Sequence, residues 1–220
     1  MPKNPLVMFD LDGTLVNTVE SIVECANLAR VQFGYPKRES SEIFNMVGMP
    51  PSNFFNDLKI LEIEEERLVL EFRLKLNLVR FSIADLYPST IKVLTILRSN
   101  GIKLAVTTNK PTANAELLLT KTGVRHFFSH VQGSDGLKPK PHPDILRKAI
   151  EICNSERSLM VGDRSEDMIA AKQSGVISVG VAQTAHSKLT LLEAGADYVF
   201  DTMEEFGNEA NLNLILDTIR

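Results

Sequence analysis

The chain has 220 residues, of which 44% are hydrophobic and 24% are charged, and these proportions are typical of globular proteins. They argue against a disordered, collagen-like or coiled-coil chain. The formal net charge is −4, from 24 basic and 28 acidic residues, so the basic excess expected of a nucleic-acid-binding protein is missing. The length allows one large domain, or one domain that carries an insertion.

The cysteines and the apolar segments bear on the cellular compartment. Cys25 and Cys153 cannot form a disulfide framework, and their spacing matches no metal motif. No apolar run approaches the roughly 18 residues that a membrane span needs. Residues 1–5 lead directly into an apolar segment and leave no room for a signal peptide. We therefore expect a soluble cytoplasmic protein that binds neither membranes nor nucleic acid.

The first predicted element is a buried strand at residues 6–9. From about residue 16 to residue 85 the pattern changes to helical periodicity with turn signals and no convincing strand. Within it, residues 19–29 form an apolar helix stripe, and residues 58–78 are charged and rich in leucine. About seventy residues of helix directly after the first strand indicate an inserted helical subdomain.

From residue 90 onwards, short apolar segments alternate with amphipathic ones. Strands are predicted at residues 103–107, 159–162, 176–181 and 198–200, and helices at residues 90–100, 111–122, 144–153 and 167–174. Alternation of this kind predicts an α/β fold with a parallel sheet and helices on both of its faces.

Two aspartates directly follow the first predicted strand. Asp10 and Asp12 belong to the segment Asp10-Leu-Asp-Gly-Thr14, and ligands of open α/β sheets bind at the carboxyl ends of the strands. One carboxylate can attack or bind a metal while the other transfers protons, provided that their environments differ. An ordinary Asp-Gly turn is the alternative for this segment taken alone.

Thr108 and Asn109 follow the strand at residues 103–107, directly before a predicted helix. A hydroxyl and backbone amides beside a helix N-terminus are suited to holding an anion, although an ordinary helix cap uses the same residues. Further on, prolines stiffen residues 136–144 and would determine where the Lys140 ammonium points. A rigid exposed loop is the alternative there.

Asp163 and Asp167 follow the strand at residues 159–162, and their spacing lets both face one place across a single helical turn. Together with Asp10 they gather the oxygen ligands that Mg²⁺ prefers. A capped helix with a solvated acidic turn is the alternative. The four segments together indicate one site more strongly than any of them does alone.

These segments resemble the four motifs of the haloacid dehalogenase-like hydrolase superfamily, and the similarity extends from residue 5 to about residue 206. The helical region resembles the cap of the phosphoglycolate phosphatase-like branch. Residues 105–111 and 193–198, which lie outside this region, also resemble that branch. The resemblance implies a Rossmann-like core from residues 1–15 and 86–220, a helical cap from residues 16–85, bound Mg²⁺ and an aspartyl-phosphate intermediate.

The resemblance also implies a role for each motif residue. Asp10 would be the nucleophile, and Asp12 would protonate the leaving alcohol and then activate water. The metal would be held by the Asp10 carboxylate, the Asp12 backbone carbonyl and Asp163, with Asp167 in or just beyond that shell.

Thr108, the backbone amide of Asn109, and Lys140 would hold the phosphoryl oxygens. This assignment agrees with the chemistry, because phosphoryl transfer depends mainly on positioning and on neutralising the charge of the equatorial oxygens. A covalent route also divides one difficult step into two easier ones.

Three positions depart from the pattern of the superfamily. Asn17 stands where many relatives have aspartate, and we expect it still to cap the following helix. Thr107 precedes Thr108 where valine is usual, which leaves open which hydroxyl contacts phosphate. Arg164 stands where a small residue is common, and ion pairs near the site or exposure to solvent are both compatible with it.

The favoured hypothesis is a Mg²⁺-dependent phosphatase that acts on a small phosphorylated metabolite resembling phosphoglycolate. Haloacid dehalogenases lack the second aspartate, here Asp12, which separates them from this chain. Phosphonatases use a cap lysine that forms a Schiff base, and Lys59 and Lys75 keep that alternative open. A sugar phosphomutase is the nearest rival, although Gly13-Thr14 favours a phosphatase weakly. A phosphoacceptor signalling domain is less favoured because it needs only about half this length and has no use for a cap.

The cap would determine which substrate is bound. Arg73, Lys75 and Arg80 are candidates to meet a carboxylate or second anionic group of the substrate, and solvated helix faces are the alternative for each. Among the histidines, His142 lies nearest to the motif residues. The sequence leaves the oligomeric state open.

Overall fold

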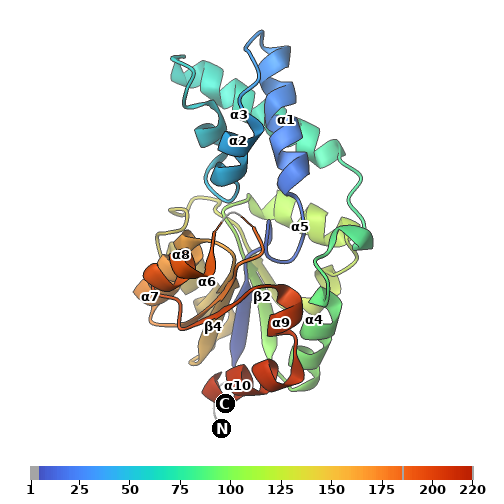
Figure 1. Ribbon diagram of the computed structural model, residues 1–220, viewed down its shortest axis with the longest axis vertical. Coiled ribbons are helices and arrows are strands. Elements are labelled where there is room, and N and C mark those ends of the chain that lie inside the picture. The colour runs from blue at the N-terminus through green and yellow to red at the C-terminus, as the bar shows by residue number, and fades with distance from the viewer. Residues whose placement is uncertain (1–4, 185, 220) are drawn as a thin grey trace.

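The computed structural model describes residues 5–184 and 186–219. Its centre is a sheet of six parallel strands in the order β3-β2-β1-β4-β5-β6 (Figure 1). The strands are β1 (Leu6–Phe9), β2 (Lys103–Thr107), β3 (His130–Gln132), β4 (Ser158–Gly162), β5 (Ile177–Val181) and β6 (Tyr198–Phe200). The predicted α/β, Rossmann-like fold is therefore confirmed.

Helices connect the strands and cover the sheet. They are α1 (Val19–Gln32), α2 (Ser40–Met46), α3 (Glu62–Leu78), α4 (Thr90–Ser99), α5 (Thr112–Lys121), α6 (Asp144–Cys153), α7 (Ser165–Ser174), α8 (Lys188–Glu193), α9 (Met203–Phe206) and α10 (Glu209–Ile219), with short 3₁₀ turns at Pro51–Phe55, Ile83–Asp85 and Arg125–Phe127. In the described residues, no helix is long and apolar enough to cross a membrane.

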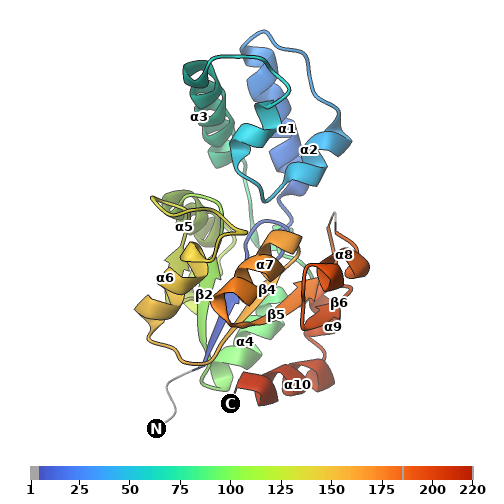
Figure 2. The same cartoon turned by 90° about the vertical axis from the view of Figure 1, so that its left-hand side faces the viewer.

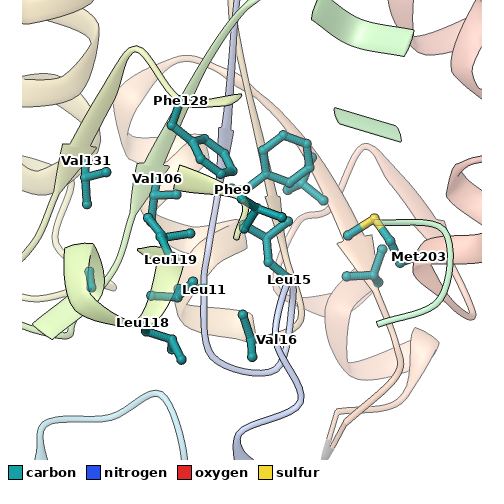
Figure 3. Close-up of a cluster of buried hydrophobic side chains, with 14 of the residues drawn as sticks. Phe9, Leu11, Leu15, Val16, Val106, Leu118, Leu119, Phe128, Val131 and Met203 are labelled. Carbon is teal, nitrogen blue, oxygen red and sulfur yellow. The ribbon is translucent and has the colours of Figure 1, made fainter. Parts of the chain in front are cut away.

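The alternating side chains of the strands divide the interior into two layers. Val7 and Phe9 of β1 face a large cluster that includes α4, α5, α9 and α10, whereas Leu6 and Met8 face a smaller cluster with α6 and α7. In the large cluster the rings of Phe9 and Phe128 meet edge to face with their centroids 6.5 Å apart (Figure 3). Both faces of β1 are therefore buried, which explains its unbroken apolar sequence.

Helices α1, α2 and α3 lie together at one end of the molecule, beyond the carboxyl ends of the strands, and the described chain ends lie near the opposite end (Figures 1 and 2). Phe54 and Phe72 join the turn at Pro51–Phe55 to α3 through rings 5.3 Å apart. Between residues 16 and 85 the described chain contains helices and turns and no named strand. That residues 16–85 form a separate cap stays a prediction.

The sequence-based prediction missed several elements. Strand β3 has only three residues, and Val131 alone among them is buried, so no alternation is visible. Helices α8, α9 and α10 were not predicted either. Helix α7 begins at Ser165, two residues before the predicted start, because Asp167 is the third residue of its first turn and its Oδ2 accepts a hydrogen bond from the Arg164 amide.

Candidate active site

The register of the sheet brings three loops together. Phe9 pairs with Val106 of β2 on one side and with Val161 of β4 on the other, so the three strands end at the same level. The next residues along each strand are polar and buried: Asp10 and Asp12 after β1, Thr108 after β2, and Asp163 after β4. The expected meeting of these residues at one edge of the sheet is confirmed.

Lys140 connects two of the carboxylates although it lies on a separate loop. Its side chain is 3% exposed, and its ammonium donates hydrogen bonds to Asp10 Oδ1 at 2.7 Å, to the Thr107 carbonyl at 2.9 Å and to Asp167. Burial alone would lower the pKa of Lys140, but Asp10 and Asp167 together outweigh burial and raise it. Lys140 therefore stays positively charged inside the protein.

Asp10, Asp163 and Asp167 form a cluster of buried carboxylates in which one oxygen of each lies within 4.8 Å of the others. Asp163 accepts hydrogen bonds from the hydroxyl of Thr14, at 2.6 Å, and from that of Thr184. Burial, followed by the charge of Asp10, raises the pKa of Asp163 to about 6.

Burial also raises the pKa of Asp10 to about 6, against the lowering effect of Lys140. The pKa of Asp167 is raised as well, again chiefly by burial. One lysine therefore compensates three carboxylates only in part, and the remaining negative charge and the oxygen donors suit a small divalent cation.

The carboxylate of Asp12 has different partners from that cluster. Its Oδ1 accepts a hydrogen bond of 2.8 Å from Thr18, and its Oδ2 lies 2.9 Å from the Lys110 ammonium. Asp10 and Asp12 therefore have different environments, as two carboxylates with different roles require. The proposed metal contact of Asp12 concerns its backbone carbonyl and stays a prediction.

The two threonines after Val106 point in different directions. The Thr107 hydroxyl is fully buried and donates to the sulfur of Met160, 3.2 Å away. Thr108 lines a cavity together with Asp10 and Asp12, and its Oγ1 accepts a hydrogen bond from the Lys110 amide. This geometry favours Thr108 over Thr107 as the phosphate contact.

The side chain of Asn109 holds the loop that carries Lys140. Its Oδ1 accepts a hydrogen bond from the Lys140 amide at 2.7 Å, and its Nδ2 donates to the carbonyls of Lys140 and Gly48. Only the backbone amide of Asn109 was expected to be functional. The structure thus adds a positioning role for the side chain that the motif alone does not indicate.

The cavity beside the catalytic candidates has a volume of about 50 Å³. Its walls come from the strand ends and from the helical region: Asp10, Asp12, Thr108, Asn109, Lys110, Pro111 and Asn114 on one side, and Ile22, Gly48, Met49, Pro51, Phe54, Phe72, Arg73 and Leu76 on the other. The helical side is mostly apolar, and Arg73 is its one charged lining residue among the described ones.

Of the three basic candidates in the helical region, Arg73, Lys75 and Arg80, Arg73 lines this cavity. Its Nε is buried and has no hydrogen-bond partner among the described residues. Lys75 instead lies 3.0 Å from Glu71 and donates to Gln32, and Arg80 is exposed. Lys59, the other lysine considered for a Schiff base, is exposed and is not a lining residue either.

Sequence reasoning missed three residues around the site, Thr14, Lys110 and Thr184, and left two alternatives open for Arg164. Thr14 and Lys110 belong to recognisable motifs but received no role. Thr184 lies in a loop without any sequence signal. Arg164 is 3% exposed, and it donates to the Asn45 carbonyl at 3.0 Å and pairs with Glu166, so it does not face solvent. His142 pairs with Asp144 outside the cavity lining.

Comparison with known families explains this arrangement. Residues 7–181 match the haloacid dehalogenase-like hydrolase family. The chain belongs to this family. Among curated proteins it is 32% identical to a probable phosphatase, IndB, of Dickeya dadantii, over 97% of this chain and 96% of the relative. It is 31% identical to a phosphoglycolate phosphatase of Haemophilus influenzae, over 89% and 93% of the two chains.

Solved structures of the family have the same overall fold. A predicted phosphatase from Clostridium acetobutylicum superposes with a TM-score of 0.84 at 26% identity, over 99% of this chain and all of the other. A predicted phosphoglycolate phosphatase from Haemophilus somnus gives a TM-score of 0.82 at 26% identity, over 97% and 99% of the two chains. The similarity covers the helical region as well as the sheet.

Proposed function

We propose that this chain is a Mg²⁺-dependent phosphatase that hydrolyses a small phosphomonoester through an aspartyl phosphate on Asp10. One observation carries the proposal: the Asp10 carboxylate lines the cavity, receives a hydrogen bond from Lys140, and lies in a cluster with Asp163 and Asp167. The names of the curated relatives, phosphatases and phosphoglycolate phosphatases, support the same activity.

The donor set fits Mg²⁺. Asp10 and Asp163 offer carboxylate oxygens, Asp12 would add its backbone carbonyl, and Asp167 would complete or support the shell. When bound, the ion would neutralise charge on the phosphoryl oxygens. Thr14 orients Asp163 through a hydrogen bond, as supporting residues of metal sites commonly do.

In the first step Asp10 Oδ attacks phosphorus, so that an Asp10 O–P bond forms while the bond from phosphorus to the alcohol oxygen breaks. Asp12 gives its proton to the departing oxygen. In the second step Asp12 takes a proton from water, whose oxygen attacks phosphorus, and the Asp10 O–P bond breaks. Inorganic phosphate leaves and Asp10 is regenerated.

The remaining motif residues would hold the phosphoryl group during both steps. Thr108 offers a hydroxyl and Asn109 a backbone amide to the oxygens that carry negative charge. The Lys140 ammonium, which donates to Asp10, Thr107 and Asp167, would exchange one of these hydrogen bonds for one to a phosphoryl oxygen. The Asn109 side chain fixes the backbone of Lys140 at both its amide and its carbonyl. The ammonium is therefore held in place before substrate arrives, which reduces the cost of reorganisation.

The cavity supports a substrate with a second anionic group, as phosphoglycolate has. Arg73 lies on the wall opposite the catalytic aspartates, and its buried Nε has no partner among the described residues. A substrate carboxylate would supply the missing acceptor. A small phosphorylated carboxylic acid is therefore the substrate class that we propose.

The test is phosphate release from a panel of phosphomonoesters, including phosphoglycolate, with Mg²⁺ and with a chelator. We expect metal-dependent release that Asp10→Asn reduces on the order of 10³-fold or more, because the nucleophile is lost. Asp201→Asn, which changes an aspartate paired with Lys188 at the surface, is the control and should keep full activity. Absence of release from every compound by folded, metal-loaded protein would refute the proposal.

A further inference from the structure

Lys110 has no role in the proposed reaction, although its ammonium lies in the candidate active site. It lines the same cavity as Asp10, Asp12 and Arg73. Its Nζ is 2.9 Å from Asp12 Oδ2, and its side chain is 12% exposed. Among the described lining residues, Lys110 and Arg73 are the two cations, and they come from opposite walls of the cavity. Lys110 therefore supplies the positive charge of the wall that the strand ends form.

The backbone of Lys110 is held in place by its neighbours. Its amide donates a hydrogen bond to the hydroxyl oxygen of Thr108 at 3.2 Å, and its carbonyl accepts one from the Ser134 amide at 3.3 Å. Pro111 follows directly and restricts the conformation of Lys110 further. Gly133 packs so closely that a Cβ there would lie 2.5 Å from the Lys110 carbonyl oxygen. The side chain therefore extends from a rigid base, which suits a residue that selects a substrate.

The ammonium of Lys110 has capacity for a second acceptor. An ammonium carries three N–H donors, and within the described part of the chain Asp12 is the one ion-pair partner of this group. Lys140 differs, because its ammonium already donates to Asp10, Thr107 and Asp167. Lys110 can therefore bind an incoming anion without releasing Asp12.

Lys110 lies on the side of the phosphoryl group from which the alcohol departs. In the proposed reaction Asp12 gives its proton to the departing oxygen, and the Lys110 ammonium lies beside the carboxylate of Asp12. In phosphoglycolate a single carbon separates the departing oxygen from the carboxylate. Since the cavity has a volume of only about 50 Å³, a carboxylate bound so close to Asp12 stays within reach of Lys110.

We propose that Lys110 is a specificity-determining residue, whose ammonium binds the carboxylate of the substrate while Arg73 binds it from the opposite wall. This role rests on the proposed function, because Asp12 marks the departing oxygen only in that reaction. A carboxylate has two oxygens and can accept from both cations. The substrate class is therefore a phosphate ester whose alcohol part carries a carboxylate one carbon from the ester oxygen. An ester with a neutral alcohol part lacks this acceptor and should bind more weakly.

Binding without turnover tests the proposal. The probes are phosphoglycolate and hydroxyethyl phosphate, which has a hydroxymethyl group in place of the carboxylate. Calorimetry with the full chain carrying Asp10→Asn, in the presence of Mg²⁺, measures both affinities. Adding Lys110→Met should weaken the binding of phosphoglycolate about 10- to 100-fold, as expected for the loss of a charge-assisted hydrogen bond. The binding of hydroxyethyl phosphate should change only slightly, and Lys110→Arg, which keeps the charge, should recover most of the affinity for phosphoglycolate.

Lys148→Met in the same background is the matched control. It also removes a lysine that pairs with one carboxylate, that of Glu151 at 3.0 Å, but it lies outside the cavity lining and should leave both affinities unchanged. Equal losses for the two probes in Lys110→Met would show that Lys110 serves Asp12 or the phosphoryl group, and would overturn the proposal. Phosphoglycolate binding that is unchanged in Lys110→Met, or undetectable in the protein with native Lys110, would overturn it as well.

Phosphate release separates the role of Lys110 from the proposed function. With Asp10 intact, a loss of kcat that Lys110→Met shows for both esters reports the contact with Asp12, whereas KM should rise for phosphoglycolate alone. Metal-dependent release without this selective rise would refute the role of Lys110 and leave the phosphatase intact. Lys110-dependent binding without any release would instead refute the phosphatase and leave Lys110 as a binding residue.

Discussion

Gly13 allows the loop after β1 to approach Asp163. Its φ of +89° is a conformation that side chains rarely adopt, and a Cβ there would lie 2.6 Å from Asp163 Oδ2. We expect Gly13→Ala to lower the free energy of unfolding by at least about 2 kcal/mol and the activity on the order of 10²-fold, because Asp163 must move.

Gly34→Ala is the matched control for that change. Gly34 has a similar φ of +81°, but a Cβ there meets nothing within 4 Å. It should lose only about 1 kcal/mol from backbone strain and keep its activity. Urea unfolding and phosphate release of the two variants separate strain from collision. Equal effects on activity would show that contact with Asp163 is unimportant.

Arg73→Gln tests which part of the substrate the cavity reads. We expect kcat/KM for phosphoglycolate to fall about 10- to 100-fold, since a charge-assisted hydrogen bond contributes about 1.5–3 kcal/mol. The value for a neutral phosphomonoester of similar size should change only slightly. Lys75→Gln, which alters a lysine already paired with Glu71, is the control. Equal losses for both substrates would mean that Arg73 supports the cavity without binding a second anion.

Individual motif residues could be predicted because each follows a strand that the apolar pattern shows. Asp10 and Asp163 are examples, and parallel strands bring their ends together. The partners of these residues could not be predicted in the same way. Lys140 lies 130 positions from Asp10, and Thr184 reaches Asp163 from a loop after β5, so these contacts depend on the folded chain.

At the level of elements, β1, β2, β4, β5 and even the three-residue β6 were predicted from their apolar runs, whereas β3 was missed. Strand β2 matches its predicted range because Leu104, Ala105 and Val106 are all buried. Strand β3 has a single buried residue and depends on its hydrogen bonds with β2 rather than on its own composition. The leucine-rich segment at residues 58–78 was predicted to be helical, but periodicity could not show which of its apolar residues are buried in α3.

Arg164 connects the start of α7 to the last turn of α2 and to the loop that follows it. Its guanidinium donates to the Asn45 carbonyl at 3.0 Å, its side chain packs against Gly48, and Asn109 donates to the Gly48 carbonyl at 2.9 Å. Arg164 and Asn109 thus hold the segment at residues 45–48, of which Gly48 also lines the cavity. Arg164 is therefore placed to keep the helical region against the sheet.

We expect Arg164→Gln to raise KM several-fold with a smaller effect on kcat, and to increase cleavage by added protease near residues 16–18 and 80–88. The reason is that the shorter, neutral side chain cannot reach Asn45, so the helical region separates more often. Arg147→Gln is the control, because it also removes a hydrogen bond from a guanidinium to a backbone carbonyl, here that of Gln173. This contact lies far from the cavity, so the change should alter neither KM nor cleavage by protease. Unchanged KM and cleavage in Arg164→Gln would contradict this role.

For the whole molecule, the buried carboxylates predict that stability depends on pH and on added Mg²⁺. The pKa of Asp10 and that of Asp163 are raised from 3.8 to about 6 in the folded protein. Between those pH values the folded state binds more protons than the unfolded state. Without metal, the contribution of these groups to stability is therefore present at low pH and is lost as the pH rises through about 6.

Mg²⁺ should reverse this trend. Near pH 7.5 the carboxylates are ionised, and Mg²⁺ at about 100 times its Kd should stabilise the fold by about 2.7 kcal/mol. Near pH 5 protons compete for the same oxygens, so the gain in Tm should be much smaller. Asp57 and Asp135 have lowered pKa values, so their contribution to stability changes with pH in the opposite sense. Both are present in wild type and in Asp163→Asn, and the informative quantity is therefore the difference in Tm between these two proteins. A gain in Tm from Mg²⁺ that is equal at both pH values, or that persists in Asp163→Asn, would place the cation away from this cluster.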